Sequence, residues 1–128
     1  MLIIIDSSML MLPLEKKINI SYEIERLVQI SFEIVVPQIV LDELKRLSEK
    51  ESPSVKQKAK LALELANGFV KIESNTNCHA DEEILRLALE KEAIVATNDT
   101  KLRLRLREKG IVVISLRGKN KLSLFGDI

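Results

Sequence analysis

Hydrophobic and polar positions follow two periods along the chain, one typical of strands and one typical of helices. Short apolar runs, rich in branched side chains and stopped by turn-forming residues, indicate buried strands. They predict strands at 2–5, 32–36, 69–72, 94–97 and 111–115. Helical spacing predicts helices at 21–30, 37–47, 54–67 and 79–91, and residues 8–18, which contain Pro13, indicate an irregular connection.

The run Lys101–Arg107 carries two conflicting signals. Its strict alternation of basic residues and leucines has the period of a half-buried strand. Lys, Leu and Arg are nevertheless good helix formers, and none of them is β-branched. Residues that can cap a helix precede the run, and Gly110 stands where a helix could end. We therefore predict a helix.

Strands that alternate with helices predict an α/β fold. We expect a three-layer sandwich, in which helices cover both faces of a central parallel sheet of four to five strands. A chain of 128 residues is large enough to bury a core and is most simply one domain, 1–128. Its apolar content of 46% and charged content of 30% are ordinary for a soluble globular protein.

Cysteine usage and the apolar runs predict a cytoplasmic protein. Cys78 is the only cysteine, so an intrachain disulfide is excluded and a reducing, intracellular setting is favoured. Lys16 and Lys17 follow the first apolar run instead of preceding it, which is the wrong order for a signal peptide. No stretch approaches the ~20 apolar residues of a membrane span, so we expect no membrane partner.

Two of the predicted strands lead directly into an aspartate. Asp6 follows the strand at 2–5, and Asp99 follows the strand at 94–97. Ligand sites in open α/β sheets lie at the carboxyl ends of the strands. We therefore expect these two acids at the same edge of the sheet.

Two further acids lie on predicted helices and face inward. At about 100° per residue, Glu43 falls inside the apolar arc that contains Ile39 and Leu44. Asp81 falls inside the apolar arc of the helix at 79–91, whereas Glu83 falls outside it. Acidic side chains are rarely buried unless they are paired or bind a metal. Each acid taken alone could also reach solvent at the edge of its arc, and Asp81 could be favoured by the helix dipole.

Four carboxylates at one point would repel one another unless cations kept them ionised. Oxygen ligands without a Cys–His framework favour a hard cation such as Mg²⁺ or Mn²⁺. One or two such ions suit the hydrolysis of phosphodiester bonds. The only histidine, His79, is more typical of a helix cap or surface group than of a catalytic base.

Basic residues concentrate near the C-terminus. The chain has a net charge of +1, but residues 101–121 carry eight basic residues and one acid, a net +7, so the remainder carries −6. This asymmetry indicates a polyanionic partner or a solvated charged face. The few aromatic residues are scattered, so a nucleic acid would be held mainly through its phosphates. The candidate phosphate-binding residues are Lys101, Arg103, Arg105 and Arg107.

Four motifs of the chain resemble those of the PIN domain family, named for the PilT N-terminus. They are Ile5-Asp6-Ser7-Ser8, Val40-Leu41-Asp42-Glu43-Leu44, Ala80-Asp81-Glu82-Glu83-Ile84 and Thr97-Asn98-Asp99-Thr100-Lys101-Leu102-Arg103. The resemblance implies a PIN-like α/β nuclease fold and a divalent-metal-dependent endoribonuclease. Its implied catalytic metal ligands are Asp6, Glu43, Asp81 and Asp99. The groups implied to orient carboxylates or water are Ser7, Thr97 and Asn98. Thr100, Lys101 and Arg103 stand where some members carry a further acid, so the resemblance leaves one or two ions open.

Two branches of the family fit the chain, and its tail slightly favours the first. The tail Leu116-Arg117-Gly118-Lys119-Asn120-Lys121-Leu122 resembles relatives of the ribosomal-RNA processing endonuclease of small-subunit assembly. The other branch contains the VapC-type toxins, which cut tRNA or rRNA and pair with an antitoxin. The resemblance thus implies an RNA substrate, an antitoxin or ribosome-assembly partner, and a homodimer. The alternative function is a non-catalytic PIN-fold RNA-binding or ribosome-assembly factor.

A receiver or nucleotide-binding domain is disfavoured. Asp6 stands alone after the first strand, and the chain has no GxGxxG motif.

Overall fold

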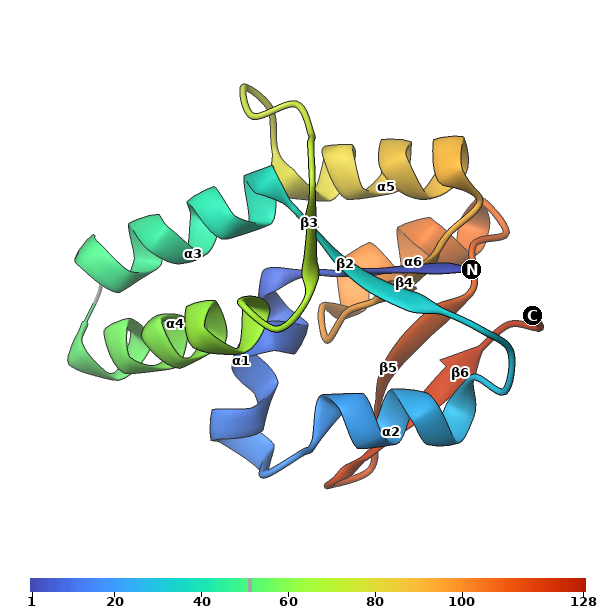
Figure 1. The fold of residues 1–128 in the computed structure, drawn as a ribbon, viewed down its shortest axis with the longest axis horizontal. Helices are drawn as coiled ribbons and strands as arrows, with labels where there is room; N and C mark the ends of the chain where they lie inside the picture. Colours follow the sequence, from blue (N-terminus) through green and yellow to red (C-terminus); the bar gives the residue numbers. More distant parts are fainter. Residues whose placement is uncertain (51) are drawn as a thin grey trace.

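A mixed sheet forms the centre of the molecule (Figure 1). The computed structural model describes residues 1–50 and 52–128, and within them the strand order is β3-β2-β1-β4-β5-β6. The strands are β1 Leu2–Ile5, β2 Glu33–Pro37, β3 Val70–Ile72, β4 Ile94–Ala96, β5 Val113–Arg117 and β6 Lys121–Phe125. Strands β1 to β5 pair in parallel, and β6 is antiparallel to β5. The predicted α/β fold with a central parallel sheet is confirmed.

Strand β1 lies at the centre of the sheet and is fully apolar. Ile4 is in register with Val35 of β2 on one side and with Val95 of β4 on the other. These three side chains are buried. Continuous burial is typical of strands in a parallel sheet that helices cover on both faces. The core that positions the site is therefore built from local apolar runs.

Strand β6 adds a sixth strand, where the sequence predicted four to five. It returns from β5 through a turn at 118–120, in which Gly118 has a φ of +75°. Positive φ is the conformation that glycine adopts at little cost. The backbone N–H of Leu122 in β6 donates to Glu23, which lies 99 residues earlier in the chain. This contact between distant residues is absent from any local pattern, which is why the strand was not predicted.

The helices are α1 Ser7–Lys16, α2 Ile20–Leu27, α3 Gln38–Lys50, α4 Pro53–Ala66, α5 Ala80–Lys91 and α6 Thr100–Glu108. In Figure 1, α5 and α2 lie on opposite sides of the sheet. Helices α3 and α4 pack side by side beyond the carboxyl ends of β1 and β2 (Figure 1). The predicted helices agree with α2 to α5 to within a few residues, the usual uncertainty of helix ends.

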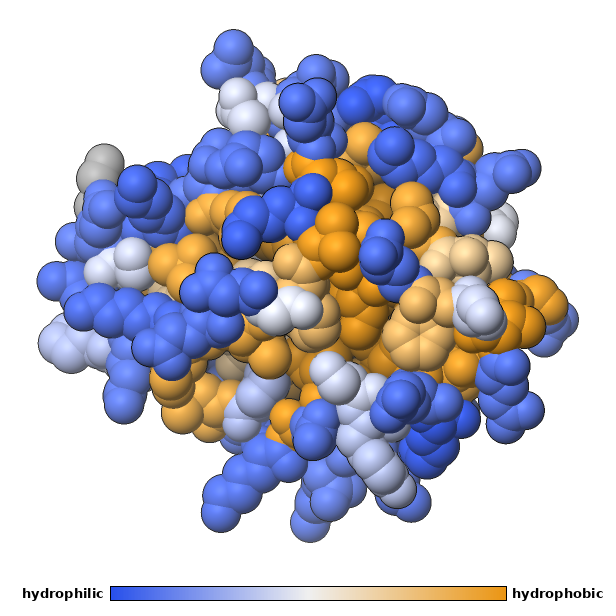
Figure 2. Space-filling view, viewed as in Figure 1, coloured by the Kyte–Doolittle hydropathy of each residue, from blue (hydrophilic) through white to orange (hydrophobic). Residues whose placement is uncertain are grey.

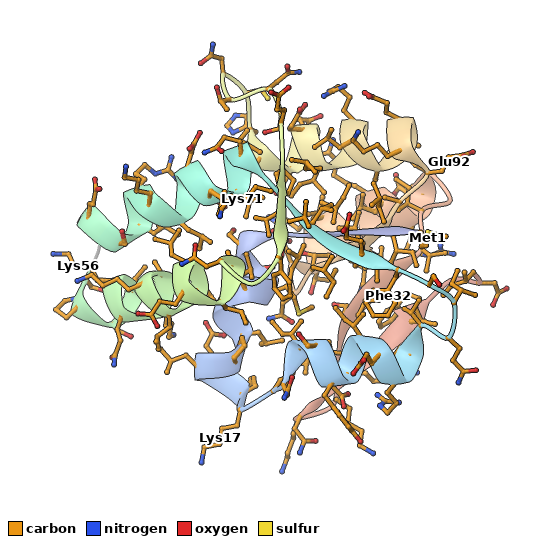
Figure 3. The ribbon with its side chains drawn as sticks, in the orientation of Figure 1. Met1, Lys17, Phe32, Lys56, Lys71 and Glu92 are labelled. Carbon is orange, nitrogen blue, oxygen red and sulfur yellow. The ribbon has the colours of Figure 1, made fainter. Side chains whose placement is uncertain are left out.

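Helix α1 corrects the prediction of an irregular connection at 8–18. Asp6 caps it by accepting a hydrogen bond from the N–H of Met9, and Met9, Leu10 and Leu12 are buried. Pro13 lies inside the helix, where proline disfavours helical structure by ~3 kcal/mol. Burial of the apolar face and the cap offset this penalty. The helix ends at Lys16, and the side chain of the following residue, Lys17, projects away from the molecule (Figure 3).

Helix α6 confirms the helical prediction for the alternating run. The carboxylate of Asp99 accepts hydrogen bonds from the N–H groups of Lys101 and Leu102. Leu102 and Leu106 are four residues apart and buried, whereas Leu104 between them is exposed. The strict alternation therefore places only every second leucine in the core.

One face of the molecule carries apolar surface at its centre, surrounded by hydrophilic side chains (Figure 2). Strand β3 crosses this face and is an edge strand, and its Val70 is exposed. Of the helices in the described part of the chain, none is long and apolar enough to span a membrane.

Candidate active site

Asp6 and Asp99 lie shortly after the ends of two neighbouring strands. Strands β1 and β4 pair in parallel, so both acids lie at the carboxyl edge of the sheet, as predicted. Glu43 lies on α3, which follows β2, and Asp81 lies in the first turn of α5. Each of these elements therefore brings one acid towards the same edge.

Asp6 is a buried carboxylate with hydrogen bonds to both oxygens. Its Oδ1 accepts from the N–H of Met9 at 2.9 Å and from Ser8 Oγ at 2.8 Å. Its Oδ2 accepts from the hydroxyl of Thr97, which is fully buried. Burial raises the pKa of Asp6 to about 6, although these hydrogen bonds act in the opposite direction, and the charge of Asp81 contributes to the rise. Asp6 therefore titrates closer to neutral pH than an exposed aspartate does.

Thr97 connects the two strand-end acids. Its Oγ1 donates to Asp6 and accepts from the backbone N–H of Asp99 at 3.0 Å. The side chain of Asp99 is half-buried and caps α6 through Oδ1. The predicted role of Thr97 in orienting the acids agrees with these contacts.

Ser7 connects Glu43 to the same edge. Its hydroxyl donates to Oε1 of the half-buried Glu43, so the start of α1 is joined to α3. The backbone N–H of Asn98 donates to Ser8 Oγ at 2.9 Å. Ser8 was not among the predicted site residues. Its signal was its position in the Asp-Ser-Ser motif, two residues after Asp6.

Asp81 is joined to the other acids through charge. Burial raises its pKa, and the charges of Asp99 and Glu43 raise it further. The charge of Arg105 acts in the opposite direction. Asp81 thus senses the charges of Asp99 and Glu43, and Asp6 senses the charge of Asp81, as expected for carboxylates that lie near one another.

The ligand atoms at this site suit a divalent ion. In this structure the same side chains accept hydrogen bonds from the protein. The donors are carboxylate and hydroxyl oxygens, which suit Mg²⁺ or Mn²⁺. Across residues 1–50 and 52–128, no three Asp, Glu, His or Cys side chains are gathered as a metal-binding cluster. Hydrogen bonds from Ser7 and Thr97 hold Glu43 and Asp6 instead. Each carboxylate has further lone pairs beside those that accept these hydrogen bonds, so the hydroxyls can stay in place while an ion binds. Metal coordination by these residues stays a prediction.

The helical-arc prediction for Glu83 is wrong, because it placed this residue on the solvent-facing side of its helix. It is 1% exposed, and Arg86 contacts both of its oxygens, with distances of 2.7 and 2.8 Å. The backbone N–H of Asn75 donates to it at 2.7 Å. The Arg86 guanidinium lowers the pKa of Glu83. The arc considers only the helix itself, and here the loop before α5 covers the side chain.

The basic residues of α6 lie on two stripes. The guanidinium of Arg103 lies 4.5 Å from the ring centre of Phe125, and Arg107 donates to the carbonyl of Ile111 at 2.9 Å. Arg105 instead reaches Glu82 of α5, with 2.8 Å between Nη2 and Oε1. Lys101 is exposed and lies four residues before Arg105, on the same side of the helix. RNA contact by these residues stays a prediction.

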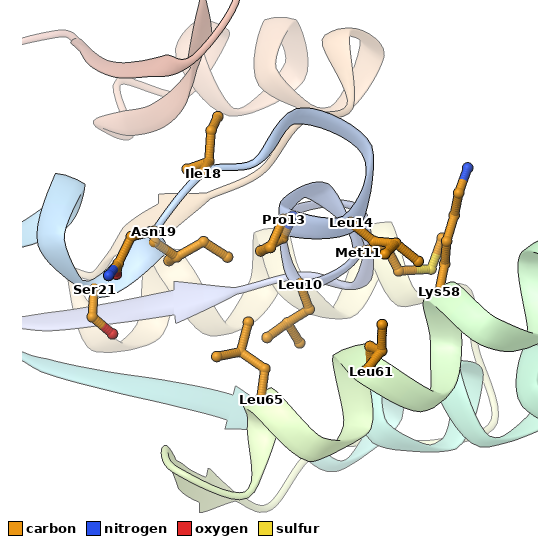
Figure 4. Close-up of a pocket in the computed structure, with 11 residues that line it drawn as sticks. Leu10, Met11, Pro13, Leu14, Ile18, Asn19, Ser21, Lys58, Leu61 and Leu65 are labelled. Carbon is orange, nitrogen blue, oxygen red and sulfur yellow. The ribbon is translucent and has the colours of Figure 1, made fainter.

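An apolar groove of ≈ 480 Å³ lies between α1, the start of α2 and α4 (Figure 4). Leu10, Leu61 and Leu65 point into it. Within the described part of the chain, its lining includes none of the four predicted acids. The groove is therefore separate from the candidate active site.

The sequence matches the family model described as "PIN like domain" over residues 3–119. The chain belongs to the PIN-like domain family. This PIN-like domain is 41% identical to Ribonuclease VapC4 of Methanocaldococcus jannaschii over 128 residues, covering 97% of the chain and 96% of that protein. The similarity is thus to a whole protein of the same size.

Solved structures show the same fold. The PIN domain endonuclease Utp24 matches this PIN-like domain with a TM-score of 0.81 and 23% identity, covering 99% of this chain and 92% of that one. A domain of a functionally unknown protein from Methanocaldococcus jannaschii matches with a TM-score of 0.67 and 16% identity, covering 94% of both chains. The predicted PIN resemblance is confirmed.

Proposed function

We propose that this PIN-like domain is a divalent-metal-dependent endoribonuclease, with Asp6, Glu43, Asp81 and Asp99 as its catalytic metal ligands. The observation that carries the proposal is the placement of acids at one edge of the sheet: Asp6 and Asp99 follow the paired strands β1 and β4, and Ser7, next to Asp6, holds Glu43. Burial raises the pKa of Asp81 and of Asp6, and the charges of the other acids add to the rise at Asp81. The similarity to Ribonuclease VapC4 over the whole chain supports RNA as the substrate.

One or two Mg²⁺ or Mn²⁺ ions bound by these oxygens would activate water and stabilise the charge on the attacking and leaving oxygens of the phosphodiester. The chain's own residues prepare the site for this chemistry. Thr97 and Ser8 hold the carboxylate of Asp6, and Ser7 holds that of Glu43. Hydrogen-bonded partners of this kind orient ligands and support their affinity for metal. Burial raises the pKa of Asp6 to about 6 in the metal-free protein, and Asp6 must lose its proton to bind an ion, so metal affinity should fall as the pH decreases.

A second candidate is a PIN-fold RNA-binding or ribosome-assembly factor without turnover. One observation favours it: across the described residues, no three Asp, Glu, His or Cys side chains are gathered as a metal-binding cluster. A weak metal site of this kind would still leave an RNA-binding surface. This candidate predicts RNA binding that weakens as the salt concentration rises, with no cleavage of the RNA.

We infer a VapC-type role within the proposed function. The similarity to Ribonuclease VapC4 extends over 97% of the chain at 41% identity, whereas Utp24, at 23% identity, shares the fold. A cytoplasmic location, a homodimer and an antitoxin that binds the protein belong to this proposal. Expression without the antitoxin should arrest growth, and the Asp99→Asn variant should not.

The decisive experiment measures RNA cleavage by the purified protein with Mg²⁺ or Mn²⁺, with and without excess chelator. Wild type should cleave, and chelation should stop it. Asp99→Asn should lower the rate by at least about a hundredfold, since loss of a ligand's hydrogen-bonding partner alone costs 10–100-fold. Asp42→Asn is the matched control, because Asp42 is exposed on α3 beside Glu43.

Two outcomes would contradict the proposal. Cleavage by Asp99→Asn at the wild-type rate would show that the assigned site is wrong. If the wild-type protein binds RNA in a salt-sensitive way but cleaves it with neither Mg²⁺ nor Mn²⁺, the second candidate is correct.

A further inference from the structure

Arg105 differs from the other arginines of α6 in where its side chain lies. Arg103 stacks on Phe125, and Arg107 is hydrogen-bonded to the backbone at Ile111. Arg103 thus contacts strand β6, and Arg107 contacts the segment just before β5. Arg105 projects from another side of α6 and crosses to Glu82 of α5.

The position of Arg105 places its charge at the acidic site. Glu82 directly follows Asp81 in the chain, and Nη2 of Arg105 lies 2.8 Å from Oε1 of Glu82. The guanidinium therefore lies beside the residue that follows a proposed metal ligand. RNA that approaches four carboxylates meets repulsion, and a cation at the rim of the site offsets it.

The contact between Arg105 and Glu82 is easily exchanged. The side chains are 43% and 56% exposed, and exposed pairs of this kind contribute little to stability. A guanidinium binds carboxylate and phosphate through the same planar set of N–H donors. A phosphate oxygen can therefore replace the carboxylate of Glu82 without loss of a buried contact.

We propose that Arg105 contacts a backbone phosphate of the bound RNA beside the acidic site, and that Glu82 is the internal partner that RNA displaces. Glu82 thus competes with the substrate and weakens its binding. Lys101, on the same side of α6, extends the contact surface by one helical turn. This inference rests on the proposed function for the nature of the substrate, RNA.

The experiment measures binding of a fluorescein-labelled, mixed-sequence single-stranded RNA by fluorescence anisotropy, over a series of salt concentrations. Excess chelator is present, so that no cleavage occurs. The proteins are wild type, Arg105→Gln, Glu82→Gln, the double variant, and Arg46→Gln as a control. Arg46 is exposed on α3, so this control removes one positive charge elsewhere on the surface.

Arg105→Gln should weaken binding severalfold at low salt. It should also reduce the slope of log K against log salt by about 0.7, the value for one phosphate contact with single-stranded nucleic acid. Arg46→Gln should leave the slope unchanged. Glu82→Gln should tighten binding, and by clearly more when Arg105 is present than in the double variant. That difference isolates the competition from the general effect of removing a negative charge.

Two results would overturn the inference. If Arg105→Gln binds with the wild-type slope, Arg105 is a surface link between helices. If Glu82→Gln tightens binding equally with and without Arg105, the exchange does not occur. Wild type that cleaves RNA while Arg105→Gln binds normally overturns this inference alone. Wild type that binds through Arg105 but forms no product with Mg²⁺ or Mn²⁺ overturns the proposed function alone.

Discussion

Asp6 combines deep burial with a negative charge. Its carboxylate is 4% exposed and accepts hydrogen bonds from Thr97, Ser8 and the N–H of Met9. Burial still dominates, because the pKa is raised to about 6 in spite of these bonds. Carboxylates in an environment that disfavours their ionised form are typical of functional sites.

The stability of the metal-free protein should therefore decrease as the pH rises through the titration of Asp6. Its pKa is about 6 in the folded protein, whereas the ordinary value for an aspartate is 3.8. The folded state binds the proton more tightly, so the contribution of Asp6 is largest below both values and is lost as the pH rises past about 6. Asp6→Asn should raise the free energy of unfolding at neutral pH by up to about 3 kcal/mol, and the gain should vanish near pH 4.

Urea unfolding in excess chelator, at neutral pH and near pH 4, measures the difference in the free energy of unfolding between Asp6→Asn and wild type. Asp42→Asn, an exposed site, is the matched control. No gain for Asp6→Asn at neutral pH would mean that the hydrogen bonds to Asp6 outweigh its burial.

Helix α5 presents Asp81 because a buried contact holds its first turn. Glu83 binds the N–H of Asn75 in the loop between β3 and α5, and Arg86 covers the carboxylate from the next turn. The loop is thereby closed onto the helix that carries Asp81. The local sequence contained this contact only as the spacing between Glu83 and Arg86.

Removal of Glu83 should loosen this element. Glu83→Ala leaves the N–H of Asn75 without its acceptor, and we expect a loss of about 1–3 kcal/mol in the free energy of unfolding. Glu90→Ala removes the other, exposed partner of Arg86 and should change it by less than about 1 kcal/mol. Urea denaturation of both variants tests the comparison. Equal effects would show that the contact with the loop contributes nothing.

The C-terminal strands join helices on the two faces of the sheet. Glu23 of α2 accepts from the N–H of Leu122 at 3.0 Å, and Arg26 donates to the carbonyl of Leu122 at 2.9 Å. Phe125 stacks against Arg103 of α6. Gly126 then passes so close to Arg107 that an added Cβ would lie 2.4 Å from Nη1. The molecule is closed by contacts between its first and last thirds.

Gly126→Ala should therefore destabilise the protein more than Gly118→Ala. Both glycines have positive φ, +104° and +75°, so each substitution carries a backbone penalty of about 1–2 kcal/mol. At Gly126, the end of the Arg107 side chain must also move aside, which disturbs its bond to the carbonyl of Ile111. Around Gly118, no atom of the described residues lies within 4 Å of an added Cβ. Thermal unfolding of both variants measures the difference, and equal melting temperatures would contradict it.

Much of the fold and of the candidate site follows from neighbours in the sequence. Apolar runs identify strands β1 to β5, and cap residues with good helix formers identify α6 in spite of its alternating pattern. The acids Asp6 and Asp99 are predictable because strand ends in a parallel sheet share an edge. Helix α1 was missed because a single proline outweighed a cap and an apolar face that only packing completes.

Contacts between distant segments decided the rest. Strand β6 depends on Glu23, and the link between α5 and α6 depends on Arg105 and Glu82. The burial of Glu83 depends on the loop that folds over it. Periodicity records only which side of an element a residue occupies. What covers that side, and which charge it meets there, is set when elements far apart in the chain pack together.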